Sequence, residues 1–78
     1  MTNLEKLTSV FAETFGIKAE EVNGLEYQGV EQWDSVGHMT LVAAIEDTFD
    51  IALDTDDIID MSSFEKAQEL LQKYNITF

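Results

Sequence analysis

Apolar residues recur at helical spacing in three separate segments of this 78-residue chain, and this periodicity is its strongest structural signal. The segments cover residues 3–15, 35–49 and 63–74. Their apolar stripes are Leu4, Leu7, Phe11 and Phe15, then Leu41, Val42, Ile45 and Phe49, then Phe64, Ala67, Leu70, Leu71 and Tyr74. No segment sustains the alternation of apolar and polar residues that is typical of a strand. The sequence therefore predicts an all-α fold.

Helix start and stop signals frame these segments. The signals are a Thr2–Glu5 capping box, Gly16 as a stop, Asp34 as an N-cap, and a second capping box of Ser62 or Ser63 with Glu65. A short turn of helix is expected at residues 55–59. Three longer helices and one short helix predict a small four-helix bundle, with residues 1–78 as a single domain. The long connection from Gly16 to Trp33 carries apolar residues, so we expect it to pack against the bundle.

The composition excludes several kinds of site. The chain has no cysteine and one histidine, so it offers neither a disulfide, nor a thiolate or multi-histidine metal site, nor a thiol of its own. Its longest apolar run, residues 41–45, is far shorter than the ~20 residues that span a bilayer, and no signal-peptide pattern begins the chain. We therefore expect a cytoplasmic protein. A chain this short buries only about 60% of its unfolded surface, which leaves little room for an enclosed active site.

The acidic residues are concentrated in the middle of the chain. Four lysines against sixteen acidic residues give a formal net charge of −12. The two ends, residues 1–18 and 65–78, are each neutral, so all of the excess lies in residues 19–64. Such a charge repels nucleic acids and anionic lipids and suits basic protein surfaces or cations. A solvated face explains the acids but not the neutral ends, so we interpret the region as a recognition surface.

One pair of residues, Asp34-Ser35, combines an acid with a hydroxyl at the expected start of a helix. The free N–H groups and positive end of the helix dipole would favour a phosphate attached to Ser35. The ordinary interpretation is that both residues only cap the helix, and on the residues alone that interpretation is favoured.

Two other chemistries fit the sequence less well. Serine hydrolase chemistry needs G-x-S-x-G after a strand, whereas Trp33 stands at the first glycine position. His38 lies three residues after Ser35, and we expect it to pack or cap rather than to act as a base, with contact to a phosphate as the alternative. The acids at residues 54–60 do not make a calcium loop, because isoleucines occupy the loop's fifth and sixth positions.

At Asp34-Ser35 the sequence resembles the acyl carrier protein family, and the likeness runs from Leu4 to about Tyr74. The most specific part is the run Asp34-Ser35-Val36, followed by Leu41-Val42, Ile45-Glu46-Asp47 and Phe49-Asp50-Ile51. The order of elements also fits: a helix, a long loop, Asp-Ser at the head of the second helix, a short acidic helix and a last helix.

The resemblance implies a discrete, non-catalytic carrier, which we expect to be a monomer. Ser35 would be esterified by phosphopantetheine from coenzyme A through a separate phosphopantetheinyl transferase, with Asp34 as the helix cap beside it, and the borrowed thiol would carry acyl groups as thioesters. Acyl-loading, acyl-transferring and condensing enzymes would dock through basic patches. The residues expected to meet them are Val36, Met39, Glu46, Asp47, Asp56 and Asp57. The acyl chain would lie between the second and third helices, near Ile45, Ile59 and Met61.

Departures from the family's pattern keep other functions open. The residue after the serine is Val36 rather than leucine, Gly37 follows inside the helix, and the Gly-Gly of many peptidyl carriers is missing before Asp34. These differences argue against a standard peptidyl carrier and against primary fatty-acid synthesis. A peptidyl or aminoacyl carrier is the first alternative. A small acidic interaction protein without a prosthetic group, and a cation-binding module, are the others.

Overall fold

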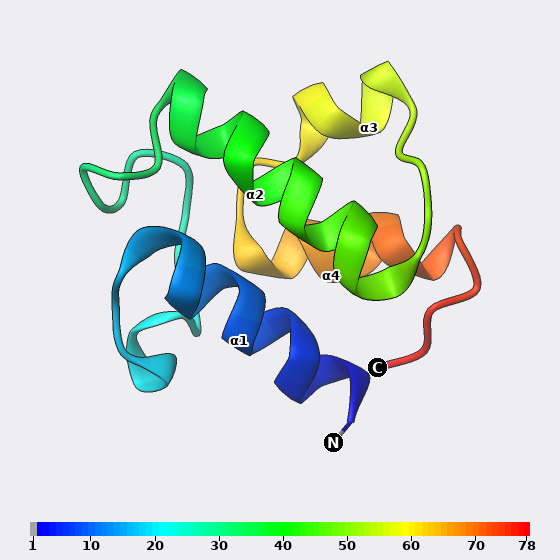
Figure 1. Ribbon diagram of the computed structural model, residues 1–78, viewed down its shortest axis with the longest axis horizontal. Helices are drawn as coiled ribbons and strands as arrows, with labels where there is room; N and C mark the ends of the chain where they lie inside the picture. The colour runs from blue at the N-terminus through cyan, green and yellow to red at the C-terminus, as the bar shows by residue number, and fades with distance from the viewer. Residues whose placement is uncertain (1) are drawn as a thin grey trace.

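The computed structural model describes residues 2–78, which contain four α-helices (Figure 1). These are α1 (Asn3–Phe15), α2 (Ser35–Phe49), α3 (Thr55–Asp60) and α4 (Phe64–Gln72), with a 3-10 turn, η1, at Ala19–Glu21. No strand occurs within these residues, so the all-α prediction is confirmed. Each α-helix begins within one residue of its expected position, α3 extends one residue further than expected, and α4 ends two residues earlier.

Capping side chains fix where the helices begin and end. The Thr2–Glu5 capping box is present, because the Glu5 N–H donates to Thr2 Oγ1 (3.1 Å) and the Thr2 N–H donates to Glu5 Oε1 (2.9 Å). Gly16 ends α1 in the left-handed region (φ 65°), which glycine adopts without strain. The second capping box is wrong: Ser63 is the N-cap of α4, but its hydroxyl accepts from the N–H of Lys66, so Glu65 lies one residue too early to complete it.

The helices α1 and α2 pack side by side and run in opposite directions, with the two ends of the chain close together (Figure 1). The side-chain amide of Asn3 donates to the Thr77 carbonyl (3.0 Å) and ties these ends to each other.

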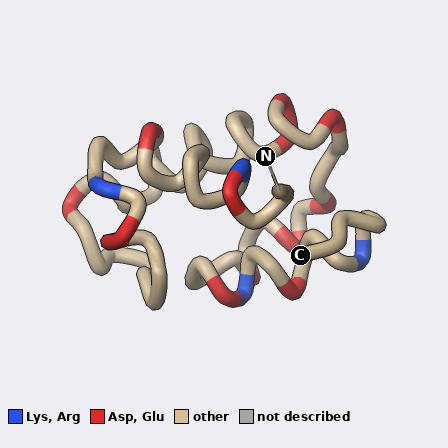
Figure 2. Tube along the Cα trace, turned by 90° about the horizontal axis from the view of Figure 1, so that it is seen from below, with Lys and Arg blue, Asp and Glu red and all other residues tan. Residues whose placement is uncertain are grey.

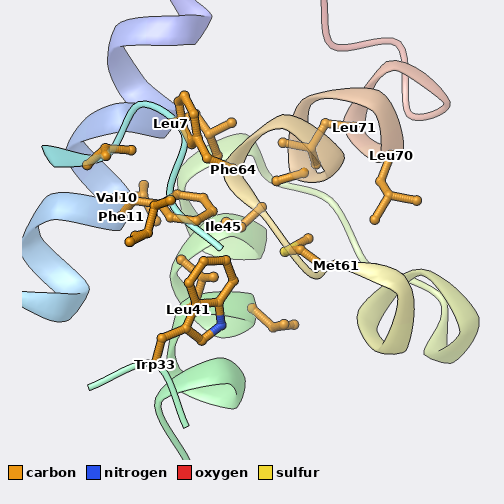
Figure 3. Close-up of a cluster of buried hydrophobic side chains, with 14 of the residues drawn as sticks. Leu7, Val10, Phe11, Trp33, Leu41, Ile45, Met61, Phe64, Leu70 and Leu71 are labelled. Carbon is orange, nitrogen blue, oxygen red and sulfur yellow. The ribbon is translucent and has the colours of Figure 1, made fainter. Parts of the chain in front are cut away.

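Trp33, at the end of the long loop, belongs to the buried core, where it lies beside Leu41 (Figure 3). Its side chain is fully buried, stacks on Phe15 (centroids 5.2 Å apart) and meets Phe11 edge to face (5.5 Å). Val22 and Leu25 of the same loop are also buried, which confirms that the long connection packs against the helices. The loop is therefore part of the core.

Two backbone hydrogen bonds attach this loop to the start of α4 and the residues just before it. The Tyr27 N–H donates to the Ser62 carbonyl and the Phe64 N–H donates to the Leu25 carbonyl, both at 2.8 Å. These bonds hold Tyr27 beside the start of α2, where Ser35 lies.

Candidate functional site

The structure separates the roles of Asp34 and Ser35 at the start of α2. Asp34 is the N-cap, and its carboxylate accepts a hydrogen bond from the Gly37 N–H at 2.8 Å. Ser35 is the first helical residue and is exposed. Within residues 2–78 its hydroxyl makes only a long contact, 3.5 Å to the Tyr27 hydroxyl. Capping therefore explains Asp34 and leaves the Ser35 hydroxyl without a structural role.

We expect Asp34→Ala and Ser35→Ala to differ in their effects on stability. Loss of an N-cap side chain costs ~1 kcal/mol, whereas removal of an exposed hydroxyl with one long contact changes stability by less than about 0.5 kcal/mol. Urea unfolding of the two variants measures the difference. Equal losses in both would show that Ser35 also supports the helix.

Gly37 lies where the chain before α2 passes close to the first turn. A Cβ built on Gly37 would lie 1.8 Å from the carbonyl oxygen of Gln32 and 3.4 Å from Asp34 Oδ1. The first of these atoms belongs to the backbone and cannot rotate away. The glycine therefore lets the Gln32 carbonyl approach the helix, and this close approach sets the path of the loop that delivers Trp33 and Asp34.

An open groove of about 490 Å³ lies between α2 and α3, and Ser35 is on its lining. Its apolar lining consists of Met39, Ile58, Ile59 and Met61, and its polar lining includes Tyr27 and Ser62. Of the three residues expected near an acyl chain, Ile59 and Met61 line this groove. The third, Ile45, is fully buried in the core and does not line it.

His38 connects the core, α2 and α3 through both of its ring nitrogens. Trp33 Nε1–H donates to His38 Nδ1 at 2.9 Å, so Nδ1 is the acceptor nitrogen of a neutral imidazole. Nε2 therefore carries the proton and donates to the Ile58 carbonyl at 2.7 Å. His38 therefore has the expected structural role, and it fulfils this role through hydrogen bonds to Trp33 and Ile58. Because both nitrogens are occupied, the ring is not available as a base for Ser35 or as a phosphate ligand.

Three apolar side chains are exposed beside the groove: Val36 (76% exposed), Met39 (54%) and Ile59 (74%). Val36 and Met39 are among the residues that the sequence predicts to meet partner enzymes, and both side chains are exposed. The sequence did not single out Ile59 as exposed, since neighbouring isoleucines in a helix of six residues give no periodicity to show which one faces outward. Val36 and Met39 lie one turn apart on α2, and Met39 and Ile59 line the groove, so we refer to these three exposed side chains as the apolar patch.

The acids expected to surround this patch have different environments. Acidic residues lie on several parts of the fold (Figure 2), and Asp47 and Asp56 are exposed. Glu46 is half-buried, and its carboxylate accepts from the Leu53 N–H at 2.8 Å, so it also fixes the chain after α2. No group of three or more metal-ligating side chains within residues 2–78 is placed to hold an ion.

The expectation that Asp57 faces partner proteins is wrong. Asp57 is buried (6% exposed), and its carboxylate accepts hydrogen bonds from Lys73 Nζ and the Tyr74 hydroxyl, both at 2.5 Å. The Tyr74 hydroxyl in turn accepts from the Asp54 N–H (3.0 Å). The hydrogen bonds from Lys73 and then Tyr74 hold the pKa of Asp57 below its usual value. Asp57 therefore anchors α3 to the end of α4.

We expect the contribution of Asp57 to stability to disappear in acid. A carboxylate whose folded-state pKa is depressed stabilises the fold fully above its unfolded pKa of ~3.9, and this stabilisation is lost as pH falls through the lower folded value. Wild-type protein should therefore exceed Asp57→Asn in stability at pH ~7, and the gap should narrow below pH ~4. Urea unfolding of both proteins across this pH range tests the expectation. A stability difference that is the same at pH ~7 and below pH ~4 would contradict it.

Comparison with known proteins finds no match to a family model, to a curated protein or to a solved structure. In the region that the structure describes, none of the helices has the length and apolar character needed to cross a membrane. The role of Ser35 is accordingly inferred from its surroundings in the fold.

Proposed function

We propose that this chain is a discrete acyl carrier protein whose Ser35 is esterified by phosphopantetheine. The observation that carries the proposal is the exposed Ser35 hydroxyl, which has no capping role and lies on the lining of an apolar groove at the start of α2. When attached, the group supplies a thiol that binds acyl groups as thioesters, and the chain itself has no cysteine to do so. Partner enzymes, rather than the carrier, perform the catalysis.

The surroundings of Ser35 fit this group. The first-turn N–H groups of α2 have no partners within the helix, and together with the helix dipole they favour a phosphate at Ser35. Asp34 satisfies the Gly37 N–H and so keeps Ser35 in the first turn. In the transfer from coenzyme A, Ser35 Oγ would lose its proton and form an ester bond to the pantetheine phosphorus, while the nucleotide half of coenzyme A leaves.

The apolar patch of Val36, Met39 and Ile59 would be the centre of the docking surface for partner enzymes, with Asp47 and Asp56 on its rim. Charge pairing of this kind mostly speeds encounter and selects partners. Modest affinity suits a carrier that must release each enzyme in turn. Asp57 is not part of this surface, since Lys73 and Tyr74 already engage it.

The loading reaction tests this proposal. After incubation with coenzyme A and a broad-specificity phosphopantetheinyl transferase, the wild-type chain should gain the mass of one phosphopantetheinyl group. Ser35→Ala should gain nothing, whereas the matched control Ser62→Ala, which changes another exposed serine of the same groove, should be loaded as fully as wild type. Loading of Ser35→Ala, or no loading of wild type, would contradict the proposal.

A further inference from the structure

The inner side of the groove is formed by a hydrogen-bonded imidazole. His38 lines the groove, while Trp33, its partner, is fully buried and is not part of the lining. The two rings are nearly parallel, with an interplanar angle of 13°, and are joined by the bond from Trp33 Nε1 to His38 Nδ1. His38 therefore lies between the groove and the aromatic core.

Displacing this imidazole would leave two polar groups without partners. Trp33 Nε1–H and the Ile58 carbonyl both bind the ring, and a donor or acceptor that loses its partner away from water destabilises the fold. By contrast, Met39 and Ile59 beside it are half or more exposed and can move without losing a hydrogen bond. Movement of Met39 and Ile59 can therefore widen the groove more readily than displacement of His38 can extend it toward the core.

We propose that His38 determines how far an apolar chain attached through Ser35 enters the fold, and that it restricts the groove to short acyl groups. This inference rests on the proposed function for its occupant. A short chain lies against the apolar lining and stops at the imidazole. A longer chain runs out of the groove over the exposed patch of α2 and α3, because the path to the core is closed by His38 and Trp33.

The absence of cysteine allows a test that does not depend on the transferase. Ser35→Cys places the only thiol of the chain at the groove, where N-butyl and N-dodecyl iodoacetamide attach a short and a long chain. The thermal midpoint Tm and the NMR signal of the Trp33 indole N–H are then measured for each adduct. The butyl adduct should raise Tm relative to an acetamide adduct, the dodecyl adduct should raise it no further, and the indole signal should not shift in either.

Two His38 variants in the Ser35→Cys background distinguish a barrier from a general structural role. His38→Ala opens the path, so the dodecyl adduct should now raise Tm above the butyl adduct and shift the indole signal. His38→Phe keeps a ring but lacks the two hydrogen bonds that hold the imidazole in place, so it should weaken the preference for the short chain. If His38→Ala does not fold, His38→Phe and the parent still test the barrier, because only the Phe variant should gain more Tm from the dodecyl adduct than from the butyl adduct.

Three outcomes would overturn the inference. The first is a dodecyl adduct that shifts the indole signal and raises Tm above the butyl adduct while His38 is present. The second is the absence of any rise in Tm with either chain. The third is a His38→Ala protein that folds and still gains nothing from the long chain. Each outcome is independent of phosphopantetheine loading, so a failure of the inference is distinguishable from a failure of the proposed function.

Discussion

Replacing Trp33 by alanine is expected to remove about 4 kcal/mol of folding free energy, which approaches the whole stability of a domain this small. The side chain is the largest fully buried one in the chain and packs against Phe11 and Phe15. Its loss would leave a cavity in the core and an unpaired acceptor on His38. The loop that positions Ser35 should lose its anchor at the same time.

Urea unfolding followed by far-ultraviolet circular dichroism measures this effect. Trp33→Phe separates the two contributions, because it keeps an aromatic ring but removes the hydrogen bond to His38, whose net worth is about 1 kcal/mol. Val36→Ala is the matched surface control and should change stability by less than about 0.5 kcal/mol. A loss below about 1 kcal/mol in Trp33→Ala would mean that the buried indole contributes little to the packing of the core.

The substitution Gly37→Ala is expected to destabilise the chain by about 3 kcal/mol, although alanine is the better helix former. Helix propensity alone favours alanine over glycine by ~1 kcal/mol. The added Cβ, however, would overlap the Gln32 carbonyl oxygen at 1.8 Å, and relief requires a backbone shift of the kind that overpacking imposes. A gain in stability would therefore mean that helix propensity dominates, and a loss would mean that the overlap with the Gln32 carbonyl dominates.

The same unfolding measurement applies, with Thr48→Ala as a matched control at an exposed position of α2. That control should leave stability within about 0.5 kcal/mol of wild type. A Gly37→Ala protein more stable than wild type would contradict the account of the loop before α2. A destabilised Gly37→Ala protein should also accept phosphopantetheine at Ser35 more slowly, because the backbone shift near Gln32 displaces the residues that hold Ser35 in place.

Local signals in the sequence were sufficient to predict the helices and the N-cap of α2, Asp34. Apolar spacing and capping residues depend on neighbours within one or two turns, so the start of α2 and the role of Asp34 could be predicted. The position of Ser35 at the first helical residue follows from the same signals.

The contacts that complete the site are tertiary and could not be predicted in this way. Trp33 lies outside any periodic segment, so its place in the core depends on how the loop folds back. Asp57 belongs to a run of acids, and only its distance from Lys73 in the folded chain separates it from exposed Asp56. The bond from His38 to the Ile58 carbonyl likewise joins residues twenty positions apart.

The attachment of phosphopantetheine to Ser35 can be verified by locating the group within the loaded chain. Trypsin cleaves after lysine, and Lys18 and Lys66 enclose a fragment, residues 19–66, that contains Ser35 together with Ser62 and Ser63. Tandem mass spectrometry of this fragment after loading should place one phosphopantetheinyl group on Ser35. An unmodified fragment, or a group on any other residue, would contradict the account.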